Sequence, residues 1–452
     1  MNAQQKFLLL SEQIAFDHKH RNTLHANLNQ HHQSFKKSIH NFDDYELAIS
    51  RAAFLRKETL ASLDQYLLAF EDKLVRNGGQ VIWAENARQA REEILKIIQE
   101  RQSNELIKAQ SSTCDEIGLK AFLEAKQITV RESSFGAALA AYTGHSSRHL
   151  VDPLGHLNQK EMLSISNQLF DDQAYSEPDV LIQKARSFMK DQWEGIRIGI
   201  SGANFLLADI GGVAITENEG NIRWLNKHCS THIVLVGIEK VISRSRDLDL
   251  FWSLLAGSAT GQTLTAYNNI FTGPSKEHGA PKELIVILLD NGRSQMLGDA
   301  DQKTALQCIR CGACQNVCPV FKTLGGESYG SPYTGPIGSV LSPYLDGIKK
   351  FGHLSQASTL CGACNTVCPV KIDLTRLLLL QRENWVDKGL SPIKERAFFG
   401  LWRRFALRNN RFWTGWGTFF DVLFLGLKNN RKEFLKIPPQ SFKKLWNSRK
   451  NK

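Results

Sequence analysis

The spacing of seven cysteines constrains this chain more than any other feature of its sequence. They fall within 61 residues, in two runs that read Cys308-x2-Cys311-x2-Cys314-x3-Cys318-Pro319 and Cys361-x2-Cys364-x3-Cys368-Pro369. Three cysteines at x2 spacing followed by x3-Cys-Pro wrap one chain segment around the corners of an iron–sulfur cube. Structural zinc fits less well, because it takes four ligands and would leave cysteines over, with no local histidine to complete a second site. The spacing therefore predicts iron–sulfur clusters.

The two runs do not supply equal numbers of ligands. In bacterial two-cluster sequences the fourth cysteine of each run binds the other cluster. This rule gives the first cluster four thiolates, from Cys308, Cys311, Cys314 and Cys368. It gives the second cluster only three, from Cys318, Cys361 and Cys364. We expect two clusters of the [4Fe–4S] type, of which the second is unusual.

Ser358 stands three residues before Cys361, where an eighth cysteine would complete the second set. The fourth iron could be bound by the Ser358 oxygen, by water or substrate, or by the distant Cys114 or Cys229. It could also be absent, which would leave a [3Fe–4S] cluster. Serine oxygen is harder than thiolate and is a poorer ligand for a soft cluster iron. On sequence alone, a packing role for Ser358 is favoured.

Two clusters that share crossing ligands lie close enough to pass single electrons, so we expect this segment to conduct electrons. Arg310, Lys322 and Lys371 lie near the ligands in sequence. Positive charges there would raise cluster potentials by stabilising the more negative reduced state. Ordinary surface charge is the alternative interpretation.

The composition, 42% hydrophobic and 22% charged over 452 residues, is that of a soluble globular protein with two or three domains. No stretch approaches the roughly 18 apolar residues of a membrane span. The first residues show no basic start and no small-residue cleavage site, so we expect no secretory signal. Cysteines without a disulfide role fit the reducing cytoplasm.

Strand and helix patterns alternate before the cysteines. Residues 1–50 read as a helical segment, 80–84 (QVIWA) as a short strand and 85–100 as an amphipathic helix. Between 190 and 300, the segments GIRIGIS, GVAIT, THIVLVGI and ELIVILLD are typical of buried strands. We expect an α/β domain over 51–300, a small helical two-cluster domain of ferredoxin type over 301–388, and a basic aromatic C-terminal segment over 389–452.

The α/β domain has no dinucleotide-binding or P-loop fingerprint. Its Gly-rich turns carry polar residues where open α/β sheets place ligands, at strand ends. Turn chemistry explains these residue types equally well. Thr260, Gly261 and Gln262 are weaker candidates of the same kind. The main ligand candidates are Asn204, Asp209, Glu217, Asn218, Glu219 and Asn221.

The net charge of +11 belongs to the C-terminal end. From Lys371 onward, 19 Lys or Arg face 6 Asp or Glu, a net of +13. Bulky apolar residues lie between these charges, as in WRRFALRNNRFW. This pattern favours docking to an acidic partner protein, with peripheral contact to a membrane surface second. Nucleic-acid binding through phosphates and base stacking fits this pattern less well.

Several separated motifs together resemble the L-lactate utilisation iron–sulfur protein family. They are CIRCGACQNVCPV, LCGACNTVCPVKIDLTRLL, GPIGSVLSP, SGANFLLADIGGVAITENEG, VGIEKVI, SATGQTLTAY and LLDNGRS. The resemblance covers most of residues 50–390 and includes the missing eighth cysteine at Ser358. One region departs: the family's acidic residues are replaced at Ser134 and Ala137, which puts a substrate or partner contact in doubt.

The resemblance implies a lactate-utilisation domain related to ribose isomerases and CoA-transferase-like proteins, followed by a two-cluster ferredoxin-type domain. It also implies work with two partner subunits in oxidising L-lactate, or a related hydroxy acid, to pyruvate. We expect an electron-transfer subunit that does not catalyse alone and passes electrons to an acceptor such as a quinone, in the cytoplasm or at the inner face of the membrane.

Two other functions stay open from the sequence. One is a redox or iron sensor that acts through the basic tail on nucleic acid or a regulatory partner. The other is an α/β domain that itself binds and transforms a small ligand, with the incomplete cluster as Lewis acid.

Overall fold

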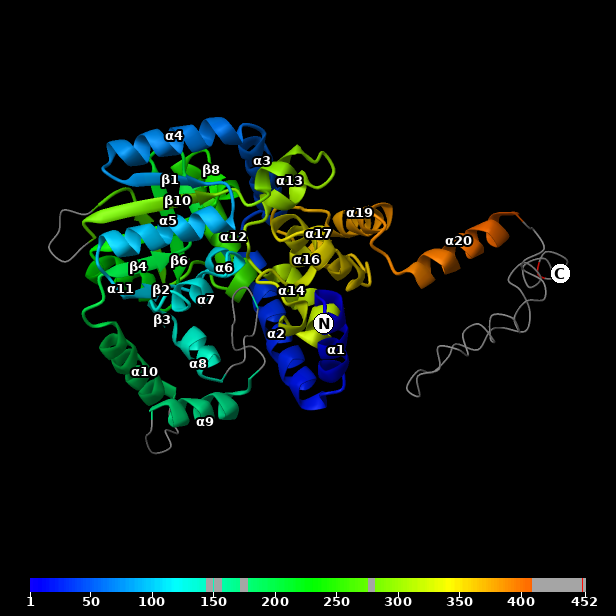
Figure 1. Cartoon of the computed structure of the whole chain (residues 1–452), viewed down its shortest axis with the longest axis horizontal. Helices are drawn as coiled ribbons and strands as arrows, with labels where there is room; N and C mark the ends of the chain where they lie inside the picture. Colours follow the sequence, from blue (N-terminus) through cyan, green and yellow to red (C-terminus); the bar gives the residue numbers. More distant parts are fainter. Residues whose placement is uncertain (144–148, 150–156, 171–177, 275–280, 409–448, 450–452) are drawn as a thin grey trace. The chain divides into compact units, whose positions relative to one another are not determined.

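The computed structural model describes residues 1–143, 149, 157–170, 178–274, 281–408 and 449 (Figure 1). Its centre is a six-stranded parallel sheet in the order β1-β10-β7-β4-β2-β3. The strands are β1 (Gln80–Ala84), β2 (Glu105–Lys108), β3 (Thr129–Glu132), β4 (Ile198–Ser201), β7 (Thr231–Gly237) and β10 (Glu283–Leu289). All connections are crossovers, so the carboxyl ends of the six strands meet at one edge.

A second, four-stranded sheet has the order β8-β5-β6-β9. Its strands are β5 (Phe205–Leu207), β6 (Gly212–Glu217), β8 (Val241–Ile242) and β9 (Tyr267–Phe271). β6 runs antiparallel to both β5 and β9, and β5 runs parallel to β8.

Alternate residues of the parallel strands fill two separate cores, because successive side chains point to opposite faces. In β7, Ile233 and Leu235 pack under α5 (Ala87–Glu100), α6 (Ser112–Glu116) and α7 (Leu119–Glu124). Val234 and Val236 face the second sheet and a core that also includes residues of three helices. Those helices are α3 (Tyr45–Ala61), α4 (Leu63–Arg76) and α12 (Leu248–Thr260).

Further helices surround the β3 and β4 side of the parallel sheet. They are α8 (Phe135–Thr143), α9 (Gln159–Phe170), α10 (Pro178–Trp193) and α11 (Asn221–His228). Trp193 of α10 and Leu225 of α11 form a third core with Ile107 of β2.

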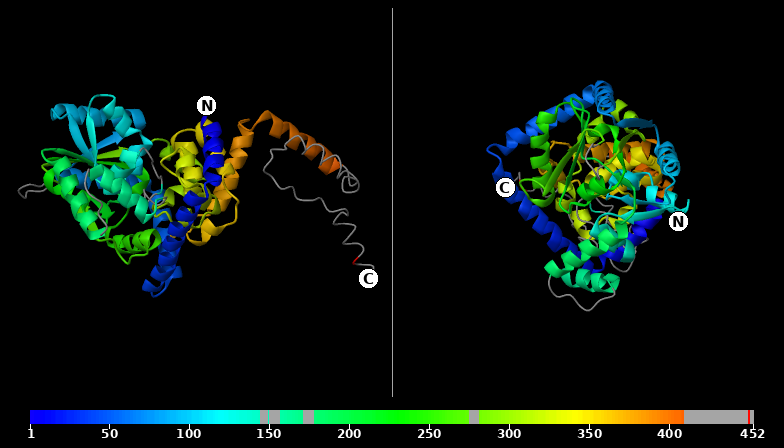
Figure 2. Two further views of the ribbon diagram at one scale, coloured as in Figure 1. Left: turned by 90° about the horizontal axis from the view of Figure 1, so that it is seen from below. Right: turned by 90° about the vertical axis from the view of Figure 1, so that its left-hand side faces the viewer.

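The cysteine runs lie among short helices. These are η4 (Lys303–Gln307), α14 (Ala313–Val317), α15 (Pro319–Leu324), α16 (Gly335–Leu345), α17 (Ile348–Phe351), α18 (Ala363–Thr366) and α19 (Leu374–Asp387), with α13 (Arg293–Gly298) before them. The N-terminal helices α1 (Ala3–Ala15) and α2 (His18–Ser38) lie against this segment (Figure 2). Leu24 and Leu28 of α2 share a core with Cys318 and Phe321.

Residues Met1–Trp385 form one compact unit, and Val386–Lys452 form another that contains α20 (Ile393–Arg408). Ile393, Phe399, Leu401 and Trp402 of α20 are exposed. The basic aromatic tail lies mostly beyond residue 408, outside the described residues. Within the described part of the chain, no helix combines the length and the apolarity needed to cross a membrane.

The structure confirms the predicted α/β class and the strands at 80–84, GIRIGIS, GVAIT, THIVLVGI and ELIVILLD. Two helices precede β1 with a break at Ser62, since α3 ends at Ala61 and α4 begins at Leu63. The apolar residues Leu60, Leu63 and Leu67 on both sides of the break are buried in the same core.

Candidate metal centres

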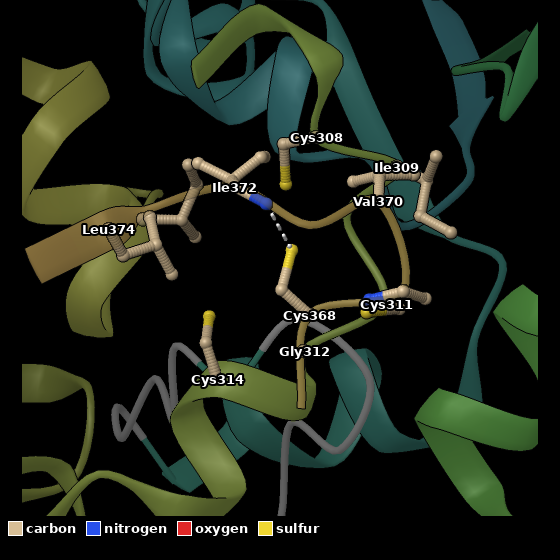
Figure 3. A pocket seen from close by; sticks show the side chains of 11 residues that line it. Cys308, Ile309, Cys311, Gly312, Cys314, Cys368, Val370, Ile372 and Leu374 are labelled. Carbon is tan, nitrogen blue, oxygen red and sulfur yellow. Dashed lines mark hydrogen bonds between the residues drawn. The ribbon is translucent and has the colours of Figure 1, made fainter. Parts of the chain in front are cut away.

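Four cysteines from the two runs line one cavity. The first run contributes three of them, and the second contributes its last cysteine, Cys368 (Figure 3). These are the four cysteines predicted for the first cluster from the rule that the fourth cysteine of each run binds the other cluster. The whole lining consists of Cys308, Ile309, Cys311, Gly312, Cys314, Ile337, Cys368, Pro369, Val370, Ile372 and Leu374.

The backbone around this cavity is folded so that amides face the sulfurs. Arg310 adopts the left-handed region at φ 63°, and its N–H donates to Cys308 Sγ at 3.4 Å. The N–H of Ile372 donates to Cys368 Sγ at 3.3 Å. Such bonds are the surroundings that thiolate ligands of iron–sulfur clusters use.

The donor set suits a cluster. Sulfur supplies the only polar side-chain atoms of the lining, and thiolates are the ligands that iron–sulfur clusters take. Burial raises the pKa of Cys311, and the neighbouring Cys308 and Cys368 raise it further. The thiols thus lie close enough to act on one another. Among the described residues, no three His, Cys, Asp or Glu side chains converge as they would on a single metal ion.

The remaining three cysteines form a second group. Burial, and after it the proximity of Cys318 and then Cys361, raise the pKa of Cys364 to about 12. Cys318 and Cys364 are buried, whereas Cys361 is exposed. The structure therefore brings together the three cysteines predicted for the second cluster, and the thiols fit the same chemistry.

Buried charges surround the first group on the side of the α/β domain. Glu239, just beyond β7, accepts hydrogen bonds from Arg293 at 2.5 Å and from Arg310 at 3.3 Å. Arg293 also makes a paired contact with Glu116, at 2.8 and 2.9 Å. Arg310 lies over the ring of Tyr333, 4.8 Å from its centroid.

Arg56 of α3 extends this network. Its guanidinium is buried and donates to four backbone carbonyls, of Glu239, Val241, Leu306 and Gln307. Burial lowers the pKa of Arg56 to about 10.

The cations in this region outnumber the carboxylates. Burial, and next the neighbouring Arg310, lower the pKa of Lys240 to about 7. Among the described residues, the buried network that reaches Cys308 through Arg310 and Arg56 contains three arginines and two carboxylates: Arg56, Arg293 and Arg310 against Glu116 and Glu239. Buried charge of one sign calls for a counter-charge, and a cluster held by four thiolates is anionic.

The three basic residues predicted to act on cluster potentials have different surroundings. Arg310 lies beside Cys308, with only 11% of its side chain exposed. Lys322 donates to Asn29 of α2 at 2.8 Å. Lys371 pairs with Glu46 at 3.1 Å and also donates to Ser50, at 2.8 Å.

Several of the ligand candidates in the α/β domain hold local backbone. Asn204 accepts from the N–H of Thr216 at 2.9 Å, within the β5–β6 hairpin. Asp209 accepts from the N–H and hydroxyl of Ser245, at 2.8–2.9 Å. These contacts are those expected of turn residues.

Glu217 and Asn218 also have partners close by. The carboxylate of Glu217 accepts from the N–H groups of Ile222 and Arg223 at the start of α11, at 2.7 and 2.8 Å. Asn218 pairs with Gln262 at 3.0 Å. Gly261 ends α12 with φ 80°, so the Thr260–Gln262 turn is a helix terminus.

Glu219 and Asn221 reach the carboxyl end of β3. Glu219 accepts from the Ser134 hydroxyl at 3.0 Å and from the N–H of Phe135 at 3.3 Å. Asn221 donates to the Ser133 hydroxyl at 3.1 Å. Ser134, where the family resemblance breaks, thus contacts one of the candidates directly.

Lys108, which ends β2 and is buried, was not among the residues predicted from the sequence. Its ammonium lies 3.2 Å from Glu132 at the end of β3 and 3.7 Å from Asp115 of α6. β2 and β4 are neighbours in the sheet, and the chain leaves β2 toward β3 but leaves β4 toward β7. Open α/β sheets bind ligands at the carboxyl ends of two such strands, where the strand order reverses. The sequence feature that could have indicated this site is a lysine placed directly after the apolar residues Leu106 and Ile107.

Two family models match this chain. Residues 67–289 match the family model of the LUD domain, and residues 304–372 match that of the 4Fe-4S dicluster domain. A solved structure, of a DUF162 family protein from Deinococcus radiodurans, covers 50% of this chain and 98% of its own at 12% identity. Its TM-score of 0.29 is too low to support a structural argument.

Curated relatives match over most of their length. A lactate utilization protein B from Bacillus velezensis is 37% identical over 372 residues, which are 81% of this chain and 77% of the relative. A lactate utilization protein B from Bacillus subtilis (strain 168) is 38% identical over 354 residues, 77% of this chain and 74% of the relative. A lactate utilization protein B from Macrococcus caseolyticus is 37% identical over 346 residues, which are 76% of this chain and 72% of the relative.

Proposed function

Because this chain belongs to the lactate utilization protein B family, we propose that it is the iron–sulfur electron-transfer subunit of a complex that oxidises L-lactate or a related hydroxy acid to pyruvate. The observation that carries the proposal is the cavity lined by Cys308, Cys311, Cys314 and Cys368. These four thiols would hold one cluster, and Cys318, Cys361 and Cys364 would hold a second. The clusters supply one-electron transfer.

The surroundings of the two cysteine groups support a direction for the electrons. The first group lies next to the buried ion network of the α/β domain, through Arg310 and Glu239. The second includes the exposed Cys361. Electrons would enter at the first site and leave at the second through the side of Cys361, where a partner can approach closely.

The buried cations support the same assignment. Their excess of positive charge beside Cys308 complements an anionic cluster and stabilises its reduced state. Arg310 and Arg56 are the residues placed to do this, since Arg56 is buried and Arg310 nearly so, which limits screening by solvent. Lys322 lies beside Cys318 and is placed to act on the second cluster, whereas Lys371 pairs with the exposed Glu46 and contributes less.

Two partner subunits and an acceptor such as a quinone complete the proposed reaction, in the cytoplasm or at the inner face of the membrane. The exposed apolar residues of α20 suit docking to a partner or peripheral membrane contact. The α/β domain, which we propose to be of the isomerase and CoA-transferase-like type, offers Lys108, Glu219 and Asn221 at strand ends as contacts for a small acid.

Reduction by substrate tests the proposal. The chain is purified without oxygen, alone and together with its two partner subunits, and L-lactate is added while the visible absorption of the clusters is followed. We expect bleaching only with the partners present, and none with D-lactate. Bleaching of the isolated chain would show that it is itself the dehydrogenase, and no bleaching in the complete complex would contradict the proposed substrate.

A further inference from the structure

We infer that the side-chain oxygen of Ser358 is the fourth ligand of the second cluster. The inference rests on the proposed function, because it requires that a cluster is bound by Cys318, Cys361 and Cys364. The sequence favoured a packing role for this serine. The structure supplies four observations that favour ligation.

The loops that begin the two runs have the same backbone. Gly312 and Gly362 both have φ 79° and ψ −5°. Two residues earlier, Arg310 and Leu360 both adopt the left-handed region, at φ 63° and 53°. Left-handed backbone is uncommon in residues other than glycine, so this pair of matches is a specific signature.

Hydrogen bonds repeat along with the dihedral angles. In each loop, the N–H of the third residue after the glycine donates a hydrogen bond to the glycine carbonyl at 2.9 Å: Gln315 to Gly312, and Asn365 to Gly362. Both loops are thus copies of one ligand-binding turn. Position by position, Ser358 corresponds to Cys308.

The side chain of Ser358 makes the same contact as that of Cys308. The N–H of Arg310 donates to Cys308 Sγ at 3.4 Å, and the N–H of Leu360 donates to Ser358 Oγ at 3.2 Å. In each case the donor lies two residues beyond the acceptor. The serine oxygen therefore takes the orientation that the ligand sulfur takes in the first loop.

Arg382 of α19 fixes the backbone of this serine. Its guanidinium donates to the carbonyl of Ser358 at 2.7 Å and to that of Ser355 at 2.9 Å. A half-buried arginine that holds two carbonyls gives the loop a defined position before any metal is bound. Preorganisation of this kind favours a ligand of otherwise modest affinity.

The distant cysteines are excluded as fourth ligands by their positions. Cys114 is buried in the core between the parallel sheet and α5 to α7. Cys229 is buried with Trp193 and Leu225 on the other face of the sheet, and its sulfur points to the carbonyl of Ile196 at 3.8 Å. Both are packed within the α/β domain, away from the second cysteine run.

The proton and the charge are both accounted for when Ser358 binds iron. The hydroxyl proton passes to water at the exposed edge marked by Cys361, and the resulting alkoxide forms an oxygen–iron bond. The ligand charge is the same as with four thiolates. A harder oxygen ligand stabilises the oxidised cluster, so the potential of the second cluster should lie below that of its cysteine-ligated variant.

Three variants and a neighbour control test the inference on anaerobically purified full-length chain. They are Ser358→Ala, Ser358→Cys, Cys308→Ser as the reciprocal change, and Gln356→Ala as the control at an exposed position. The measurements are iron per chain, EPR of the oxidised and reduced protein, and midpoint potentials. Thermal unfolding shows whether each variant is folded.

We expect wild type and Gln356→Ala to bind about eight irons. Ser358→Ala should lose about one iron and give the EPR signal of an oxidised three-iron cluster. Ser358→Cys should keep about eight irons with a raised second potential, which would also show that the loop folds when this residue changes. Cys308→Ser should keep about eight irons with a lowered first potential.

Seven irons with a three-iron signal in the wild type would overturn the inference and leave the proposed function intact. Ser358→Ala with the iron content, spectrum and potentials of wild type would overturn it as well. Loss of iron from Cys308→Ser would count against it, by showing that serine in this loop position cannot hold iron. A wild type without iron would instead refute the proposed function.

Discussion

Replacing Glu239 by glutamine should weaken the connection between the parallel sheet and the first cysteine loop. Glu239 is buried, at 1% side-chain exposure, and accepts from Arg293 and Arg310. Burial opposes its ionisation, but the two arginines more than compensate and hold its pKa at about 2, below the ordinary 4.5. The carboxylate is therefore more stable in the folded protein than in the unfolded chain.

The size of the effect follows from that pKa. A difference of about 2.5 units corresponds to about 3 kcal/mol of folding stability. Because the folded pKa is the lower one, this stability is present above about pH 4.5 and is lost as the pH falls toward 2. Removing one partner of a buried ion pair typically lowers the free energy of unfolding by about 3–5 kcal/mol, which agrees with the value from the pKa of Glu239.

Urea denaturation at pH 7, followed by tryptophan fluorescence without oxygen, measures the change. We expect Glu239→Gln to lower the free energy of unfolding by about 3 kcal/mol. Glu46→Gln is the matched control, because it breaks an ion pair with Lys371 in which the Glu46 side chain is 77% exposed. This change should lower the free energy of unfolding by no more than about 1 kcal/mol. Equal effects of the two changes would refute the argument from burial.

Three further predictions concern other buried groups. His232 is fully buried, which lowers its pKa to about 4. As the pH falls from about 6.5 to 4, the free energy of unfolding of the wild type should therefore decrease by up to about 3 kcal/mol relative to that of His232→Gln. A difference in urea midpoints that does not change with pH would contradict this. Arg56→Met should cost roughly 4 kcal/mol, since four carbonyls lose a charged donor, and a melting temperature equal to that of wild type would rule out this role. Cys114→Ala should leave iron per chain unchanged, whereas a loss of iron would place Cys114 among the ligands.

The sequence predicted those parts of the fold whose signal is local. Val- and Ile-rich segments such as THIVLVGI indicated β7, since a strand buried on both faces is apolar throughout. Short strands with partners distant in sequence were missed, as with β5, which has three residues and pairs with β6 and β8. Their stability comes from the tertiary contacts of the second sheet.

For the site, spacing predicted which cysteines meet, because the x2 and x3 intervals are properties of a single turn. It did not predict the ion network of Glu239, Arg293 and Glu116, whose members come from three separate segments of the chain. Nor could it separate ligand contacts from turn contacts among polar residues. Asp209 and Glu217 proved to cap local backbone, and only the structure shows which N–H groups they accept from.

The most direct test of the central claim is the content of iron and acid-labile sulfide per chain, with EPR before and after reduction by dithionite. We predict about eight irons per chain, a similar amount of sulfide and the EPR signals of two interacting reduced clusters. Zinc in place of iron, or a single cluster per chain, would contradict the proposal that this protein carries electrons between two centres.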